Sequence, residues 1–132
     1  AISDYKPSDF LTEKHKSSDG DLNIKLVRGK DILKTAKLKN KNIFAVGFSA
    51  ETKNIEENAK VKLVSKKIDM IIANEANHQK GLGFESDYNQ IVIINEKETT
   101  AIPLNSKKEL AKIIIHKIVS IYKKNLLKIK NA

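Results

Sequence analysis

The chain has 132 residues, of which 40% are hydrophobic, and this length suits one compact domain, residues 1–132, with a single core. The absence of cysteine excludes disulfide scaffolds, thiolate metal sites and cysteine nucleophiles, and it fits a reducing cytoplasm. No apolar run approaches the roughly eighteen residues that a membrane helix needs, and the first residues lack the basic start and apolar stretch of a signal peptide, so we expect a cytoplasmic protein.

The formal net charge of +9 raises the question of a nucleic-acid partner, because a basic surface gains affinity for a polyanion through counterion release. Of the 25 basic residues, however, all but Arg28 are lysine, whereas direct base readout depends on the bidentate arginine fork. Nucleic acid is therefore not favoured as the main partner. The chain also begins without methionine and inside a strand-like stretch, so we treat it as part of a longer polypeptide.

Hydrophobic periodicity predicts alternating strands and helices over the first half of the chain. The expected elements, in order, are a strand at Asp21–Val27, a helix at Asp31–Lys39, a buried strand at Asn42–Gly47, a helix at Asn54–Lys66 and a second buried strand at Ile68–Ala73. Such alternation is typical of a parallel sheet with crossover helices.

The second half begins with a polar loop that contains Gly81 and Gly83. Two short runs, Ile91–Ile94 and Thr99–Leu104, then predict a hairpin, and a long helix follows from about Lys107. The pattern as a whole predicts an α/β fold.

Two of the expected helices open with a residue pattern that resembles a capping box. Asn54 is followed three residues later by Glu57, and Ser106 is followed three residues later by Glu109. We expect both side chains to cap their helices.

Common catalytic and phosphate-binding motifs are absent from the sequence. Neither G-x-x-x-x-G-K-[ST] nor G-x-G-x-x-G is present, and no serine lies in a G-x-S-x-G elbow. The three histidines, His15, His78 and His116, lack the close spacing of a metal pair, and no metal site is predicted. Classical hydrolase chemistry is therefore unsupported.

The helix expected at Asn54–Lys66 carries two lysines in an unusual position. At about 100° per residue, Lys62 and Lys66 project from the face that also holds Ile55, and neither has an acidic residue four positions away in the helix. One interpretation is that the lysines snorkel at the edge of the core. The other is that they bind an external polyanion such as a triphosphate.

A second candidate site is the opening segment of the chain. Asp4 lies where a first strand would end, which is where ligands bind in open α/β sheets, and the cations Lys14, His15 and Lys16 follow it. An ordinary charged loop is the alternative, and composition does not decide between the two.

Several segments resemble the phosphopantothenoylcysteine synthetase family in order and spacing over essentially the whole chain. They are AISDYKP with EKHK, KLVRGKDIL, AVGFSAET followed by N-x-E-E and a lysine-bearing helix, IDMIIAN, and GFESDYNQIVII. The resemblance implies a Rossmann-like three-layer sandwich with a mostly parallel sheet, a C-terminal β-hairpin and a long C-terminal helix. It also implies that the chain is the C-terminal, nucleotide-binding portion of a synthetase domain whose upstream half is not included.

The resemblance also implies which residues act. Lys14 occupies the position of the family's catalytic lysine. Gly29 and Lys30 stand where the family has Asn-Pro in a turn that touches the nucleotide. The implied nucleotide site consists of Asp4, Lys30, Asp31, Ile32, Leu33, Phe48, Lys62 and Lys66.

The activity implied by the resemblance is that of a phosphopantothenate–cysteine ligase in coenzyme A biosynthesis. CTP activates the carboxylate of 4'-phosphopantothenate as an acyl-cytidylate, and the amine of cysteine then displaces CMP. Mg²⁺ is expected with the nucleotide, a homodimer in the intact enzyme, and a flavin-dependent decarboxylase as a fused or associated partner. We also expect residues 7–20 to close over the nucleotide as a lid. The rival hypothesis is a non-catalytic, lysine-rich module that binds nucleotide or RNA.

Overall fold

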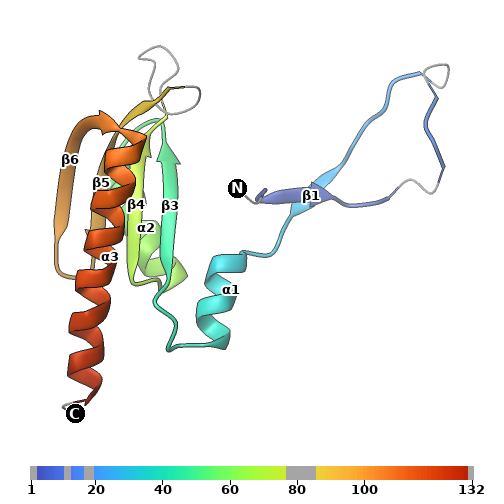
Figure 1. Ribbon diagram of the computed structural model, residues 1–132. Helices are drawn as coiled ribbons and strands as arrows, with labels where there is room; N and C mark the ends of the chain where they lie inside the picture. Colours follow the sequence, from blue (N-terminus) through green and yellow to red (C-terminus); the bar gives the residue numbers. More distant parts are fainter. Residues whose placement is uncertain (1–2, 11–12, 17–19, 77–85, 131–132) are drawn as a thin grey trace.

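The computed structural model describes residues 3–10, 13–16, 20–76 and 86–130, with side chains up to residue 124. Nine elements are assigned within these residues. In order they are β1 (Tyr5–Pro7), β2 (Leu26–Arg28), α1 (Ile32–Lys39), β3 (Val46–Glu51), α2 (Ile55–Lys66), β4 (Met70–Glu75), β5 (Tyr88–Asn95), β6 (Thr99–Ser106) and α3 (Lys107–Lys130) (Figure 1).

The main sheet has four strands in the order β3-β4-β5-β6. Strands β3 and β4 are parallel, with Val46 opposite Met70, and α2 forms the crossover between them, as the alternation of elements predicts. The predicted hairpin is also confirmed, because β5 and β6 pair antiparallel. The parallel pair is therefore β3 with β4. The two other pairs, β4 with β5 and β5 with β6, are antiparallel, so the sheet is mixed.

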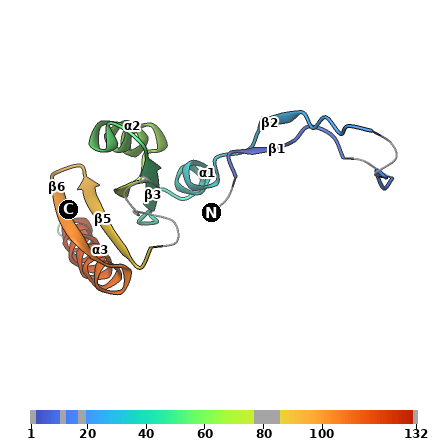
Figure 2. The ribbon, with the colours of Figure 1, turned by 90° about the horizontal axis from the view of Figure 1, so that it is seen from above.

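Helices cover both faces of this sheet, which confirms the three-layer α/β class (Figure 2). On one face, Ala59 and Leu63 of α2 and Leu33 of α1 pack against Ile71 and Ala73. On the other face, α3 packs against side chains of β4 and β5. Strand β4 is therefore buried on both sides, which explains its continuous apolar run.

Helix α3 begins with the predicted cap. The amide of Glu109 donates to Oγ of Ser106 at 3.2 Å, while the Glu109 carboxylate pairs with Lys112. Among the described residues, no helix combines the length and apolar character needed to cross a membrane, α3 included.

The capping box predicted for α2 is wrong. Asn54 precedes α2 with a φ of 48° and a ψ of 47°, and its side chain makes no capping hydrogen bond. A capping residue normally has an extended backbone that directs its side chain at the first amides of the helix. The left-handed conformation, which asparagine tolerates better than most residues, turns the side chain elsewhere.

Strands β1 and β2 form a separate antiparallel ribbon that projects away from the layered part of the molecule (Figure 1). The strand predicted at Asp21–Val27 is wrong in extent, because only Leu26–Arg28 is a strand. The apolar residues responsible for that prediction, Leu22, Ile24 and Leu26, are each about half exposed or more, so the ribbon gives them no second layer to pack against. Alternation alone does not form a strand without such a surface.

Replacing Leu110 by alanine tests how α3 is attached. Leu110 is 3% exposed and packs in the cluster between α3 and the sheet. We expect Leu110→Ala to lower the free energy of unfolding by about 2–5 kcal/mol. The control is Ile115→Ala on the same helix, where the side chain is 59% exposed and the expected loss is within about 0.5 kcal/mol. Urea unfolding followed by circular dichroism measures both, and equal losses would contradict the packing.

Candidate functional site

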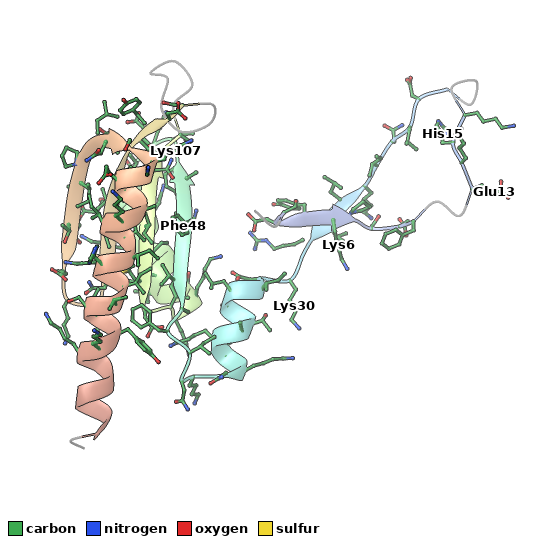
Figure 3. The ribbon with its side chains drawn as sticks, in the orientation of Figure 1. Lys6, Glu13, His15, Lys30, Phe48 and Lys107 are labelled. Atoms are coloured by element: carbon green, nitrogen blue, oxygen red, sulfur yellow. The ribbon has the colours of Figure 1, made fainter. Side chains whose placement is uncertain are left out.

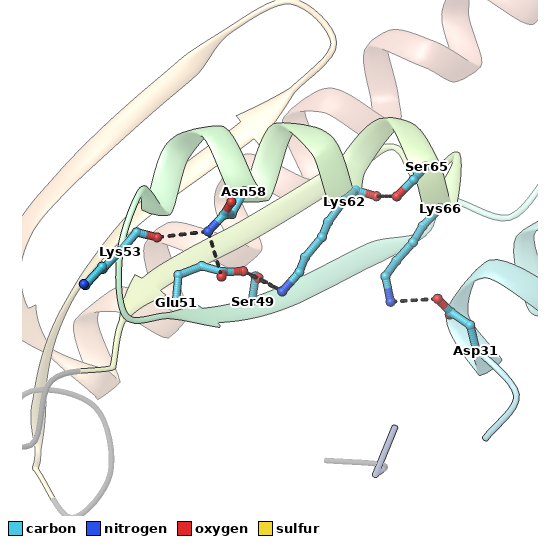
Figure 4. A network of polar contacts seen from close by, with 8 residues as sticks. All are labelled: Asp31, Ser49, Glu51, Lys53, Asn58, Lys62, Ser65 and Lys66. Carbon is cyan, nitrogen blue, oxygen red and sulfur yellow. Dashed lines mark hydrogen bonds and ion pairs between the residues drawn. The ribbon is translucent and has the colours of Figure 1, made fainter. Parts of the chain in front are cut away.

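The candidate site lies where α2 runs along β3 and meets the start of α1. Five residues connect these elements through polar contacts and are called the lysine–carboxylate site below; they are Asp31, Ser49, Glu51, Lys62 and Lys66 (Figure 4). Both lysines come from α2, and both carboxylates come from other elements.

Lys62 is held by two residues of β3. Its ammonium Nζ donates to Oε1 of Glu51 at 2.5 Å and to Oγ of Ser49 at 2.9 Å. Ser49 and Glu51 lie on the same side of β3 because side chains alternate along a strand, and Ser49 also donates to the Glu51 carboxylate. Nδ2 of Asn58, one turn earlier in α2, donates to Oε2 of Glu51 at 3.3 Å.

These contacts keep Glu51 ionised. Burial would raise the pKa of the Glu51 carboxyl, but the hydrogen bonds from Lys62 and Ser49 outweigh it and hold that pKa below its ordinary value of 4.5. The Glu51 side chain is 12% exposed, whereas that of Lys62 is 42% exposed. The cation is thus much more accessible from solvent than the anion behind it.

Lys66 contacts the start of α1. Its Nζ lies 2.8 Å from Oδ2 of Asp31, and Oδ1 of Asp31 accepts from the amide of Lys34 at 2.9 Å. Asp31 is therefore the N-cap of α1 as well as the partner of Lys66. The hydrogen bond from Lys66 is the largest cause that lowers the pKa of the Asp31 carboxyl.

The two lysines thus have partners that the helical pattern does not reveal. They lack acidic neighbours at the fourth position along α2, as predicted, but each has a carboxylate from another element. Residues four apart on a helix have Cβ atoms about 6 Å apart, so Lys62 and Lys66 present two adjacent cations. Two ammonium groups on one helix face make this site a candidate for binding a polyanion.

The other residues of α1, β3 and the segment before α1 that were predicted for the nucleotide site differ in their burial and in the side of the sheet on which they lie. Leu33 packs in the core, and Ile32 is half exposed at the start of α1. Lys30 lies in the exposed segment before α1. Phe48 is 72% exposed and lies on the opposite side of β3 from Ser49, so the sheet separates its ring from Lys62.

The predicted residues Asp4 and Lys14 are not brought to the lysine–carboxylate site in this chain. Asp4 precedes β1 rather than ending a strand of the main sheet, and its carbonyl accepts from the amide of Gly29. Lys14 belongs to the segment that joins β1 to β2, and its labelled neighbours Glu13 and His15 lie far from the main sheet (Figure 3). The prediction for Asp4 assumed that the opening segment belongs to the main sheet, but it pairs with β2 instead.

Some predicted features lie wholly or partly outside the described residues. Gly81, Gly83 and His78 belong to the segment 77–85, and the expected lid at 7–20 includes two such segments, 11–12 and 17–19. Among the residues that are described, no group of three or more His, Asp or Glu side chains is arranged to hold a metal ion.

Sequence reasoning did not single out Gly47, Ser49, Glu51 or Asn58. Gly47 has a clear steric role, because a Cβ there would lie 2.8 Å from Cδ1 of Ile68 and 3.2 Å from Cδ2 of Leu33. Its lack of a side chain lets α1 approach β3. A glycine inside a strand pattern signals such close approach, and Ser49 and Glu51 lie in the same V-G-F-S-A-E-T segment.

Comparison with known proteins places this architecture in a family. The family model described as "DNA/pantothenate metabolism flavoprotein C-terminal domain" matches residues 1–122. The "Coenzyme A biosynthesis bifunctional protein CoaBC" of Haemophilus influenzae is 35% identical over 127 residues, or 96% of this chain and 31% of the relative. The protein of the same name from Vibrio cholerae is 39% identical over 121 residues, or 89% of this chain and 30% of the relative.

Two solved structures are similar. The crystal structure of the C-terminal domain of a Coenzyme A biosynthesis bifunctional protein CoaBC has a TM-score of 0.68 at 29% identity and covers 94% of this chain and 52% of that one. The DNA/pantothenate metabolism flavoprotein of Streptococcus pneumoniae has a TM-score of 0.67 at 22% identity, over 92% of this chain and 60% of that one, and shows the shared fold. This chain spans about a third of the length of its curated relatives. It belongs to the family of DNA/pantothenate metabolism flavoprotein C-terminal domains.

Proposed function

We propose that this chain supplies the CTP-binding part of a phosphopantothenate–cysteine ligase in coenzyme A biosynthesis. The observation that supports it best is the pair of accessible cations on one face of α2, each held by a carboxylate from another element. The names of the relatives add support, since they describe bifunctional coenzyme A biosynthesis proteins. The complete reaction belongs to the intact enzyme, of which this chain is one part.

The geometry suits a phosphate clamp. An ammonium group has three N–H donors, and among the described residues Lys62 directs two of them at Ser49 and Glu51. The third is available to a phosphate oxygen. Because Glu51 already restrains Lys62, binding loses less side-chain entropy than it would with a freely rotating lysine.

The proposed reaction needs positive charge more than a general base. CTP and the carboxylate of 4'-phosphopantothenate both carry negative charge, and fixed cations stabilise the charge that develops as pyrophosphate leaves and an acyl-cytidylate forms. Lys62 and Lys66 would hold phosphates. Mg²⁺ would arrive with the triphosphate as part of the substrate, because the described residues provide no ready set of metal ligands.

The proposal also includes partners. We infer a homodimer and a fused or associated flavin-dependent decarboxylase in the intact protein, and the words "bifunctional" and "flavoprotein" in the names of the relatives are in keeping with the second. The second candidate function, a non-catalytic module for nucleotide or RNA, is favoured by the net charge of +9.

Ligand titration with variants of α2 tests the proposal. In an intact synthetase, Lys62→Ala and Lys66→Ala should each weaken CTP binding about 10- to 100-fold, because each removes a charge-assisted hydrogen bond worth about 1.5–3 kcal/mol. Lys60→Ala is the matched control, since Lys60 is exposed on the same helix and pairs with Glu56. Normal CTP affinity combined with a lower melting temperature would make both lysines structural.

Titration of the unsubstituted parent protein with CTP, ATP and a short RNA at two salt concentrations distinguishes the two candidate functions. Saturable binding that prefers CTP and depends weakly on salt supports the ligase. A steep salt dependence without preference for a base supports the module instead.

A Lys14 variant tests whether this residue acts in CTP binding or in the chemical step. If it acts on the reacting acyl centre, Lys14→Gln in an intact synthetase should keep CTP affinity but lower turnover about 100-fold or more. CTP affinity, pyrophosphate release and product formation measure both effects. An equal loss of affinity would make Lys14 a phosphate contact, and unchanged turnover would remove it from the mechanism.

The lowered pKa of the Glu51 carboxyl predicts that the free energy of unfolding depends on pH. Its folded pKa is lower than the unfolded value of about 4.5, so between these two values the unfolded chain binds more protons and stability rises with pH. The stabilisation is fully present above about pH 4.5 and is lost as the pH falls through the folded pKa. We expect the difference in free energy of unfolding between parent and Glu51→Gln to be constant near neutral pH and to shrink in acid.

The control for this measurement is the Lys62→Met background, in which the largest favourable contact of Glu51 is missing. There the effect of Glu51→Gln should lose most of its acid dependence. Urea unfolding at pH 3 to pH 7 gives the comparison, and an undiminished difference at low pH would show that Glu51 does not titrate as described.

A further inference from the structure

Helix α1 carries Asp31 to the lysine–carboxylate site, yet it has little burial of its own. It contains eight residues, and none of them is fully buried. Leu33 packs partly against the core beneath it. A helix of this length is not stable in isolation, so its position depends on the contacts at its two ends.

One of these contacts is made by Lys37 in the last turn. Its Nζ donates to the carbonyl of Ile43 at 2.6 Å, to the carbonyl of Lys41 at 3.2 Å and to Oδ2 of Asp69 at 2.7 Å. All three donors of the ammonium group are thus used inside the protein. The Lys37 side chain is 14% exposed, in contrast to Lys62, which retains a donor and is more open to solvent.

Asp69 connects this contact to the sheet. Its Oδ2 also accepts from the amide of Ala45 at 2.7 Å, and its own amide donates to the carbonyl of Ala45 at 3.0 Å. Ala45 directly precedes β3, and Asp69 directly precedes β4. Lys37 therefore fastens the C-terminal end of α1 to the point where the two parallel strands begin.

The other end of α1 is fastened by Asp31, which accepts from Lys66. The two contacts lie six residues apart, or about 9 Å along the helix axis. If the Lys37 end is released, Leu33 still packs against the core, but we expect α1 to be less restrained and Asp31 to hold the ammonium group of Lys66 less firmly.

We propose that Lys37 is a positioning residue for the nucleotide site, which it orders by anchoring α1 to Asp69 and thereby holding Asp31 against Lys66. This proposal rests on the proposed CTP-binding function. Lys37 touches no substrate, and its effect passes through Lys66.

The test compares Lys37→Met with Lys39→Met in an intact synthetase. Methionine keeps an apolar stem of similar length but cannot donate, and Lys39 is an exposed lysine in the same turn. For Lys37→Met we expect the KM for CTP to rise about tenfold while kcat at saturating CTP stays within about twofold. Measurements well below the melting temperature of each variant keep loss of fold out of the comparison.

Two further measurements show whether Lys37→Met affects the KM for CTP through α1 and Lys66. In a Lys66→Ala background, Lys37→Met should raise the KM for CTP no further, because its effect passes through Lys66. Without ligand, the amides of α1 should exchange hydrogen faster in Lys37→Met than in Lys39→Met, with exchange in α3 unchanged. If Lys37→Met does not fold, Lys37→Arg serves in its place, since it keeps the charge but has a different donor geometry.

The outcomes separate the two proposals. A parent enzyme without affinity for CTP would overturn both. A parent that binds CTP, with a Lys37 variant whose KM for CTP and α1 exchange match those of Lys39→Met, would overturn this proposal alone. Additive effects of the Lys37 and Lys66 substitutions would also overturn it, because Lys37 would then act independently of Lys66.

Discussion

The burial of β4 on both of its faces is the constraint on which the other elements depend. Met70 and Ile72 pack towards α3, while Ile71 and Ala73 pack towards α2, and all four are nearly inaccessible. Burying one such isoleucine contributes about 1.5–3 kcal/mol, so both helical layers are needed to cover the strand. Once α2 lies over β4 and its parallel neighbour β3, the edge of its apolar face that carries Lys62 runs along β3. Lys62 then comes within reach of Ser49 and Glu51.

The carboxylates explain how two neighbouring lysines are tolerated without a ligand. Like charges four residues apart on a helix cost a few tenths of a kcal/mol, and a buried carboxylate without a partner costs considerably more. Pairing Lys62 with Glu51 and Lys66 with Asp31 offsets these costs. A phosphate then does not need to replace the carboxylates. Under the proposed function, it needs only the N–H donors of Lys62 and Lys66 that the carboxylates and Ser49 do not use.

The sequence predicts the layered part of the fold better than the ribbon, and the physical reason differs between them. The apolar runs at Asn42–Gly47 and Ile68–Ala73 predict two buried parallel strands and their crossover helix, although β3 begins four residues later than predicted, at Val46, and β4 begins two residues later, at Met70. In the ribbon, alternating residues such as Leu22 and Ile24 have no layer to cover them, and the same signal fails. At the site, helical spacing correctly indicates that Lys62 and Lys66 lack neighbouring acids on α2. Their actual partners come from β3 and α1, and a local pattern contains no information about such contacts.

The distance between the ribbon and the lysine–carboxylate site bears directly on the mechanism. The residues proposed to hold phosphates lie on packed elements whose positions are set by the core. Lys14 instead belongs to the segment that joins β1 to β2, and its neighbours Glu13 and His15 lie outside that packing (Figure 3). A cation that acts only on the transition state does not need to contact the ground-state nucleotide, so it does not need to be held beside the phosphates before they bind. It does have to reach the reacting carboxylate once both substrates are in place. Under the proposed function, pairing of β1 with β2 does not by itself hold Lys14 at that point, so we propose that another part of the intact enzyme or a second copy of the chain does so.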